Sequence, residues 1–421
     1  MARSTTFKYT VTVSNPGSGN KYYIDGNLQQ YVILFPGCTY EFNQDDSSNA
    51  THPLRFSETS DGTHNSGSEY TTNVTTSGTP GSATAWTKIE VTSSTPVTLY
   101  YYCSSHSGMG GHIDVPSSVN GNRGYILGGA VGGAPGPGTN KIESIIINTL
   151  GNASDFGDLP TSDHRSGFGS SNSTKSIVAG GGNPSNINVI SCMINNSLGS
   201  AHDFGDLTAT TRRGSAVSNN TRCVFGGGLT PGIVNVISYV TYATIGNATD
   251  FGDLTTATGD MAGGLNSTTR GVFAGGATPS KVNTIQYITT ASTGNATDFG
   301  DLTQARQFCA GVSSSTRGVV SGGNSSPTSP TNVMDYITIS STGNATDFGD
   351  MTTIFDDSGF MGVSNSLRGV WSGVCAPSNG TRSTIMEYIT ISTTGDTLDF
   401  GDLTVATNFG MASSDGHGGL S

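Results

Sequence analysis

The chain has 421 residues, of which 60 are glycine and only 11% are charged, and its 18 Lys and Arg against 30 Asp and Glu give a formal net charge of −12. This balance excludes a nucleic-acid partner, because affinity for phosphates comes from Lys and Arg. No apolar run approaches the roughly 18 residues of a membrane span, so no membrane insertion is expected. The first residues also lack the apolar core of a secretory signal peptide.

Residues 1–115 contain seven or eight short runs rich in β-branched and aromatic residues. Each run is bounded by turn residues, which is typical of β-strands. The runs are 7–14, 21–26, 30–35, 39–44, 52–57, 87–93, 97–103 and 112–115. This number of strands in about 115 residues predicts a β-sandwich.

A candidate metal site lies near the end of this segment. Cys103, His106 and Met109 follow one another with the spacing C-x₂-H-x₂-M, and His52 stands upstream, directly before a predicted strand. One thiolate, two imidazoles and a thioether are the ligands of a blue-copper site. His64 and His112 occur in polar or Gly-rich surroundings and are expected at the surface.

Over residues 5–115 the sequence resembles the cupredoxin family. The likeness includes the aromatic run before Cys103, the Asn-x-x-His pattern that ends at His52, and the Gly-rich tail with its final strand. The ligand loop is similar in length to the short amicyanin type. The resemblance implies copper held by His52, Cys103, His106 and Met109. Two alternatives stay open: the four residues serve packing without a metal, or they hold another metal.

Residues 116–122 are expected to form a linker, and residues 123–421 then repeat one pattern six times. A nine-residue phrase such as GNATDFGDL begins at Gly151, Gly199, Gly246, Gly294, Gly343 and Gly395. A second phrase, a basic residue followed by an apolar run and glycine, begins at Arg123, Lys175, Arg222, Arg270, Arg317 and Arg368. Each period reads as four short strands, as in a β-propeller blade.

Over residues 119–421 the sequence resembles the Kelch family. The Gly doublet, the Tyr of the next strand (Tyr287, Tyr336 and Tyr388) and an aromatic on the fourth strand occur in Kelch order, although Phe replaces the Kelch Trp. The resemblance implies a six-bladed β-propeller. Because an open blade edge invites aggregation, residues near 407–414 are expected to complete the blade of residues 123–159. The predicted fold is therefore all-β: a cupredoxin-like sandwich followed by a closed six-bladed, Kelch-like propeller.

Two features of the repeat allow more than one interpretation. The DFGD carboxylates could bind Ca²⁺ or substrate, but identical copies in every blade favour local turn geometry. The repeated Arg is expected to pair with a neighbouring Asp. The loops after the second strand differ between repeats, which indicates either a recognition face or unconstrained drift.

The functional expectation is a non-enzymatic virion protein. The weakly charged, Gly-, Ser-, Thr- and Asn-rich repeats resemble virion structural proteins of marine bacteriophages, including cyanophages. The resemblance implies a fibre or decoration protein in the virion, with other virion proteins and a host-surface receptor or glycan as partners. One alternative is a copper redox protein with a type 1 site, and another is a carbohydrate-binding adhesin. A homo-oligomeric arrangement stays open.

Overall fold

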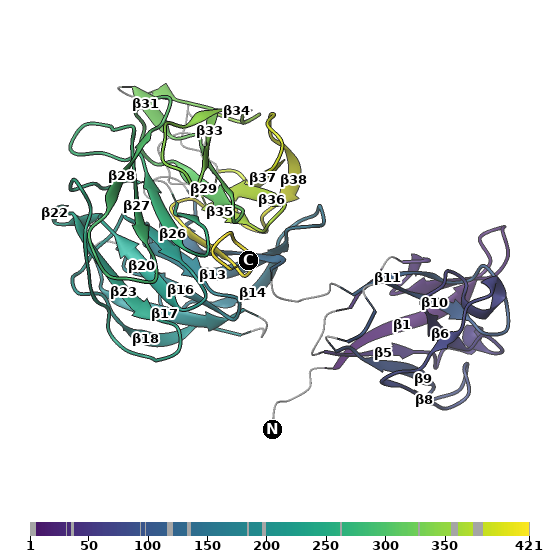
Figure 1. Cartoon of the computed structure of the whole chain (residues 1–421). Coiled ribbons are helices and arrows are strands. Elements are labelled where there is room, and N and C mark those ends of the chain that lie inside the picture. The colour runs from purple at the N-terminus through teal and green to yellow at the C-terminus, as the bar shows by residue number, and fades with distance from the viewer. Residues whose placement is uncertain are drawn as a thin grey trace. The chain divides into compact units, whose positions relative to one another are not determined.

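The chain folds into β-structure throughout the described residues (Figure 1). The computed structural model describes residues 6–30, 32–34, 38–92, 94–96, 98–115, 121–132, 136–182, 185–195, 199–261, 263–326, 329–354, 361–373 and 382–420. The chain divides into two compact units, Met1–Val119 and Asn120–Ser421. Of the predicted linker 116–122, residues 116–120 lie outside the described residues. No helix in the described ranges has the length and apolar character that crossing a membrane requires.

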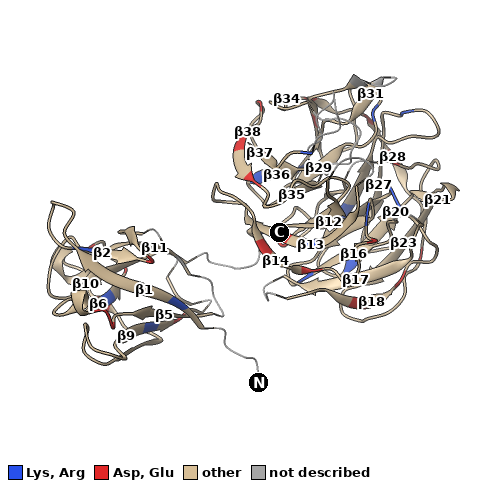
Figure 2. Cartoon of the chain, turned by 180° about the vertical axis from the view of Figure 1, so that it is seen from behind, with Lys and Arg blue, Asp and Glu red and all other residues tan. Residues whose placement is uncertain are grey.

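Charged side chains occupy little of either unit. Lys and Arg, and Asp and Glu, colour only short parts of the two ribbons (Figure 2). The described structure therefore rests mainly on strand pairing and apolar packing.

The first unit consists of short strands and two 3₁₀ turns. They are β1 (Thr6–Ser14), β2 (Lys21–Ile24), β3 (Asn27–Leu28), β4 (Val32–Ile33), β5 (Thr39–Asn43), η1 (Ser47–Asn49), β6 (Leu54–Ser57), η2 (Gly62–Asn65), β7 (Glu69–Tyr70), β8 (Val74–Ser77), β9 (Trp86–Glu90), β10 (Thr98–Cys103) and β11 (Gly111–Asp114). One sheet has the order β3-β2-β1-β5-β9-β8 and the other β4-β11-β10-β6-β7.

An apolar core holds these two sheets together. Phe42 on β5 and Phe56 on β6 belong to different sheets, and their rings meet edge to face with centroids 5.3 Å apart. Both side chains are fully buried, together with Leu54, Tyr101 and Cys103. Alternation along the strands sends one side of each sheet into this core.

The second unit contains six four-stranded sheets. The first is built from β12 (Arg123–Ala130), β13 (Gly138–Ile146), β14 (Ser154–Asp158) and β39 (Met411–Ser414). The second is β15 (Phe168–Ser171), β16 (Lys175–Ala179), β17 (Val189–Ile194) and β18 (His202–Asp206). The third is β19 (Ser215–Ser218), β20 (Arg222–Gly226), β23 (Val236–Thr241) and β24 (Thr249–Asp253). The four strands predicted for each repeat are confirmed.

The remaining three sheets follow the same plan. The fourth is β25 (Leu265–Asn266), β26 (Arg270–Ala274), β27 (Thr284–Thr289) and β28 (Thr297–Asp301). The fifth is β29 (Ala310–Ser313), β30 (Arg317–Ser321), β33 (Val333–Thr338) and β34 (Thr346–Asp350), and the sixth is β35 (Met361–Ser364), β36 (Arg368–Ser372), β37 (Ile385–Thr390) and β38 (Leu398–Asp402). Two small ribbons pair β21 (Leu229–Thr230) with β22 (Gly232–Ile233), and β31 (Asn324–Ser326) with β32 (Ser329–Pro330).

The C-terminal strand completes the first sheet, as the sequence predicts. β39 pairs antiparallel with β12, so that Ala412 faces Ile126 and Met411 faces Leu127. Without this strand the first sheet would expose the unpaired backbone groups of β12.

Two parts of the repeated nine-residue phrase join each sheet to the next: its first glycine, called the turn glycine, and its DFGD motif. In every repeat the turn glycine donates its N–H to the carbonyl of the DFGD phenylalanine of the preceding sheet, at 2.7–3.3 Å. The pairs are Gly199–Phe156, Gly246–Phe204, Gly294–Phe251, Gly343–Phe299, Gly395–Phe348 and Gly151–Phe400. The last pair joins the sixth sheet to the first, so the hydrogen-bonded sequence of sheets forms a cycle.

The repeated arginine also links neighbouring sheets. Arg270 stacks on Tyr287 of its own sheet at 4.4 Å and donates to the carbonyl of Ile339 in the next repeat at 2.9 Å. Arg222, Arg317 and Arg368 make equivalent stacking contacts and donate to carbonyls of the following repeat. In these four repeats the guanidinium is engaged by a ring and a carbonyl, and the predicted pairing with a neighbouring Asp is replaced by these contacts.

Candidate metal centre

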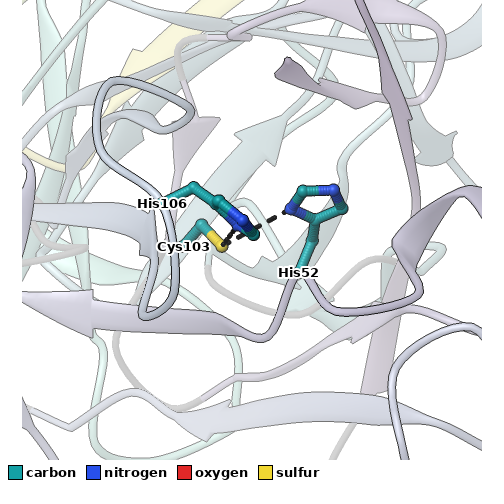
Figure 3. Close-up of side chains that lie close together, drawn as sticks. All are labelled: His52, Cys103 and His106. Atoms are coloured by element: carbon teal, nitrogen blue, oxygen red, sulfur yellow. Dashed lines mark hydrogen bonds between the residues drawn. The ribbon is translucent and has the colours of Figure 1, made fainter.

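His52, Cys103 and His106 come together at one end of the first unit (Figure 3). Cys103 is the last residue of β10 and pairs in register with Leu54 of β6. His52 stands two residues before Leu54, so the pairing of β6 with β10 carries it to Cys103. His106 follows Cys103 in the loop between β10 and β11. Strand pairing and one short loop thus unite residues far apart in the chain.

The sulfur of Cys103 lies at metal-site distances from a nitrogen of each histidine. The Sγ of Cys103 lies 3.8 Å from Nδ1 of His52 and 3.7 Å from Nδ1 of His106, and all three atoms lie within 4.8 Å of one another. Metal–sulfur and metal–nitrogen bonds of about 2.3 and 2.0 Å at tetrahedral to trigonal angles place a sulfur and a nitrogen ligand about 3.5–3.7 Å apart. The two sulfur–nitrogen distances therefore match those expected around a single ion.

Burial prepares His52 to act as a ligand. Its side chain is almost fully buried, and burial, followed by the nearby His106, lowers the pKa of His52. Nitrogen ligands must be unprotonated, so this shift favours the metal-binding form. His106 is exposed, which leaves one side of the cluster accessible to solvent.

The second ring nitrogen of His52 has a partner that can fix its tautomer. Its Nε2 lies 3.3 Å from the side-chain amide of Asn20. In the structure Nδ2 of Asn20 faces Nε2; a half-turn of the amide would bring its oxygen there, so that Nε2 carries the proton and Nδ1 keeps its lone pair for a metal. Such outer partners orient histidine ligands in metal sites.

Met109 lies in the apolar core of the first unit. Its side chain is 1% exposed and belongs to the same apolar cluster as Cys103. Its backbone carbonyl accepts the N–H of Tyr22 at 3.0 Å, which ties the ligand loop to β2. The structure thus places the thioether on the buried side of the loop and His106 on the exposed side.

Several residues that hold the ligands in place were missed by sequence reasoning. The carbonyl of His52 accepts hydrogen bonds from Tyr22 Oη at 2.8 Å and Gln44 Nε2 at 2.9 Å. His64, expected as an ordinary surface residue, is exposed but contacts the carbonyl of Cys103 through Nε2 at 2.9 Å. Asp61 accepts the N–H of Gly108 at 2.8 Å. These residues share no motif, so only the fold reveals them.

The cysteines outside this cluster have no disulfide partner in the described structure. Cys38, Cys192, Cys223 and Cys309 are free, as is Cys103, whereas Cys375 lies outside the described residues. Burial raises the pKa of Cys192 to about 11 and that of Cys223 to about 12. These thiols are protonated at neutral pH and behave as small apolar side chains.

The DFGD carboxylates belong to the junctions between sheets. The backbone N–H of the final Asp donates a hydrogen bond to a side chain of the next repeat, as where Asp253 N donates to Asn295 Oδ1 at 3.0 Å. The motif glycine adopts a positive φ and closely approaches the turn glycine of the next repeat, as Gly252 does with Gly294. These contacts favour the turn-geometry interpretation of the motif. Among the described residues, His52, Cys103 and His106 form the one group of His, Cys, Asp or Glu side chains that could hold a metal ion.

No protein-family model matches the chain, and no curated protein matches it either.

Proposed function

We propose that the first unit is a cupredoxin-like copper-binding module and that the second is a six-bladed, Kelch-like β-propeller. For the first unit, support comes from two sheets around one core and from the cluster at the end of β10. For the second, it comes from six four-stranded sheets, from β39 on β12, and from the cycle of contacts that returns from Phe400 to Gly151.

The function that the geometry supports best is binding of a single copper ion by the first unit. The observation that carries it is the spacing of Sγ of Cys103 from Nδ1 of His52 and of His106, 3.8 and 3.7 Å. Those three side chains would hold the ion, and Met109 would supply a weak fourth ligand. A thiolate and a thioether are soft ligands that select copper over hard cations. Bound copper would supply one-electron redox chemistry.

A copper titration of the full chain tests this proposal. Copper(II) is expected to bind with one-to-one stoichiometry and to produce the intense thiolate-to-copper absorption band of a type 1 site. Cys103→Ser should abolish the band, whereas Cys38→Ser, at a half-buried free cysteine outside the cluster, should retain it. Binding of zinc without any copper band would overturn copper as the resident ion.

For the whole chain we propose a non-enzymatic structural role in a phage particle, with the second unit as its recognition module. The support is that the repeated Arg, Phe and Gly residues join neighbouring sheets, which leaves the differing loops after each second strand available for partners. Parts of these loops, residues 133–135, 183–184, 327–328 and 374–381, lie outside the described residues. Mass spectrometry of purified particles should detect the chain, and its absence from them would refute this role.

A further inference from the structure

A central cavity of about 120 Å³ lies in the second unit. Every one of the six sheets contributes to its lining, through Ala412, Phe168, Ser215, Asn266, Gly311 and Gly362. Serine hydroxyls and glycine backbone make much of this wall. The Oγ of Ser215 is buried and has no hydrogen-bond partner among the described residues. The cavity therefore offers polar groups to an occupant.

The C-terminal tail covers one end of the cavity. His417 Nε2 lies 2.8 Å from the carbonyl of Ser171, and Gly418 donates to the carbonyl of Ser313 at 3.0 Å. A Cβ on Gly418 or Gly419 would lie within 2.2 Å of backbone oxygens of three repeats. The tail is thus packed directly against the strands that line the cavity, so a ligand must enter from the opposite end.

The opposite end is lined by a set of residues that we call the entrance ring. It comprises Ser166, Arg213, Asp260, Phe308 and Phe409, which occupy the same position in five repeats. Their backbones are linked in order: each of Ser166, Arg213, Asp260 and Phe308 donates its N–H to the carbonyl of the previous member, at 2.7–2.9 Å. The sixth repeat's position falls in 355–360, outside the described residues.

All five entrance-ring residues have left-handed backbones, with φ from 54 to 59°. Glycine adopts this conformation without strain, yet none of the five is glycine. The junction motifs are nearly identical in every repeat, whereas this position carries a hydroxyl, a cation, a carboxylate and two aromatic rings. Strained backbone that is retained together with differing side chains is characteristic of binding sites.

Four arginines gather around the entrance ring. Arg165 precedes Ser166 and stacks over Phe409 at 4.7 Å, and Arg212 precedes Arg213. Arg382 donates from Nε to Asn408 Oδ1 at 2.6 Å, directly beside Phe409. Burial lowers the pKa of Arg165 most. The positive charges of Arg382, Arg213 and Arg212 repel its guanidinium and lower this pKa further.

Two acidic groups of the described residues stand near these four arginines. Asp260 lies 3.5 Å from Arg213, and Asp163 lies two residues before Arg165. The buried Nε atoms of Arg212 and Arg213 have no hydrogen-bond partner among the described residues. In a chain of net charge −12, this cationic site is suited to an anion.

We propose that the cavity and its entrance ring bind an acidic saccharide unit. Its carboxylate would meet Arg213 and the neighbouring guanidinium groups. Its hydroxyls would reach the serine and backbone groups of the wall, and its apolar face would lie against the half-buried rings of Phe308 and Phe409. The proposal deepens the recognition role given above to the second unit and does not depend on copper.

Calorimetric titration of the full chain with glucuronate and galacturonate tests the site, with glucose and inorganic phosphate as comparison probes. At least one uronate should bind, at least tenfold more tightly than either comparison probe. Arg213→Gly should weaken binding at least tenfold while keeping the fold, because glycine accepts the left-handed backbone. Asp260→Gly, the matched control at the next ring position, should strengthen binding by removing a repelling carboxylate.

The outcomes separate the parts of the proposal. Absence of uronate binding to the wild type overturns it, and so does unchanged binding by both Arg213→Gly and Arg165→Ala. Phosphate binding as tight as that of the uronates overturns the saccharide class. None of these results bears on the presence of the chain in particles, which mass spectrometry decides separately.

Discussion

Gly401 and Gly151 lie in the last and first repeats, and a Cβ built on Gly401 would stand 2.5 Å from the carbonyl oxygen of Gly151. The backbone of Phe400 accepts the N–H of Gly151 at 2.9 Å in the same contact. The equivalent contact recurs between all other consecutive repeats. The last and first repeats are therefore joined by the same contact as the other consecutive repeats, in addition to the pairing of β39 with β12.

Replacement of Gly401 by alanine is expected to destabilise the second unit by about 3 kcal/mol. The new methyl group would clash with the Gly151 carbonyl, and φ of +142° would strain any side chain. Gly151→Ala is the matched control: its φ is +149°, but a Cβ there meets nothing within 4 Å. Urea unfolding should give a clearly smaller loss for the control. Equal losses would contradict a tight contact between the two repeats.

The buried ion pair of Arg306 and Asp335 offers a test based on the repeats themselves. Both side chains are fully buried and lie 2.8 Å apart, and Asp335 also accepts hydrogen bonds from Thr303. Asp335→Ala should cost about 3–5 kcal/mol, because it leaves a guanidinium buried without its counter-charge.

The preceding repeat holds Thr258 and Gln286 at the corresponding positions, where Gln286 accepts the equivalent bonds from Thr255. The double change Arg306→Thr with Asp335→Gln should therefore recover to within about 1 kcal/mol of the wild type, since it removes both charges together. Chemical denaturation of the single and double variants measures the difference. A double variant as unstable as Asp335→Ala would show that the repeats are not interchangeable here.

His417 should make stability fall at acidic pH. Burial lowers the pKa of His417 to about 4, and Gly419 donates its N–H to Nδ1 at 3.1 Å, where a second proton would have to sit. Between about pH 6.5 and 4 the unfolded chain binds a proton that the folded chain does not. This contribution is present above pH 6.5 and lost progressively down to pH 4, by roughly 3 kcal/mol.

The comparison protein for this effect is His417→Gln, whose side chain does not titrate. The stability difference between the two proteins, followed from pH 7 to 4 by thermal unfolding, isolates the histidine. Burial raises the pKa of Asp415 to about 7, which acts in the opposite direction, but this residue is present in both proteins. A difference that does not change with pH would mean that His417 is not buried as a neutral ring.

Met109→Leu should separate ligation from packing. Leucine has similar volume, so the buried position should accept it at a cost under about 1.5 kcal/mol. Copper should still bind through His52, Cys103 and His106, but the reduction potential should change, because the axial ligand tunes it. Voltammetry of the copper-loaded protein measures this change. An unchanged reduction potential would mean that the Met109 thioether packs in the core and does not bind the copper.

The repeat made much of the second unit predictable. Its period fixed six groups of four strands, and the surplus strand motif before Ser414 anticipated the pairing with β12. The contact of the repeated Arg with the next repeat was missed. Its acceptors are backbone carbonyls, such as that of Ile339, and every residue type has a carbonyl, so no sequence pattern identifies them. The entrance ring was also missed, because left-handed backbone at Arg213 or Phe308 has no compositional signal.

The candidate metal cluster was predicted from residue types and spacing alone. Cys103 and His106 are close in sequence, and His52 precedes a strand whose pairing with β10 brings it near. Asn20 and His64 could not be found this way. Each contacts the cluster from a different segment through a single polar atom, and such contacts depend on the register of the folded strands.

The first sheet of the second unit needs a strand that is synthesised after the other five sheets. While a ribosome is still extending the chain, β12 has only β13 beside it, and the Gly151 turn has no sixth repeat to meet. The five later repeats can form as they emerge, but the unit as a whole cannot close until translation reaches Ser414. A nascent chain stalled before that point would expose β12 to pairing with other molecules, so complete synthesis protects this protein from misassociation.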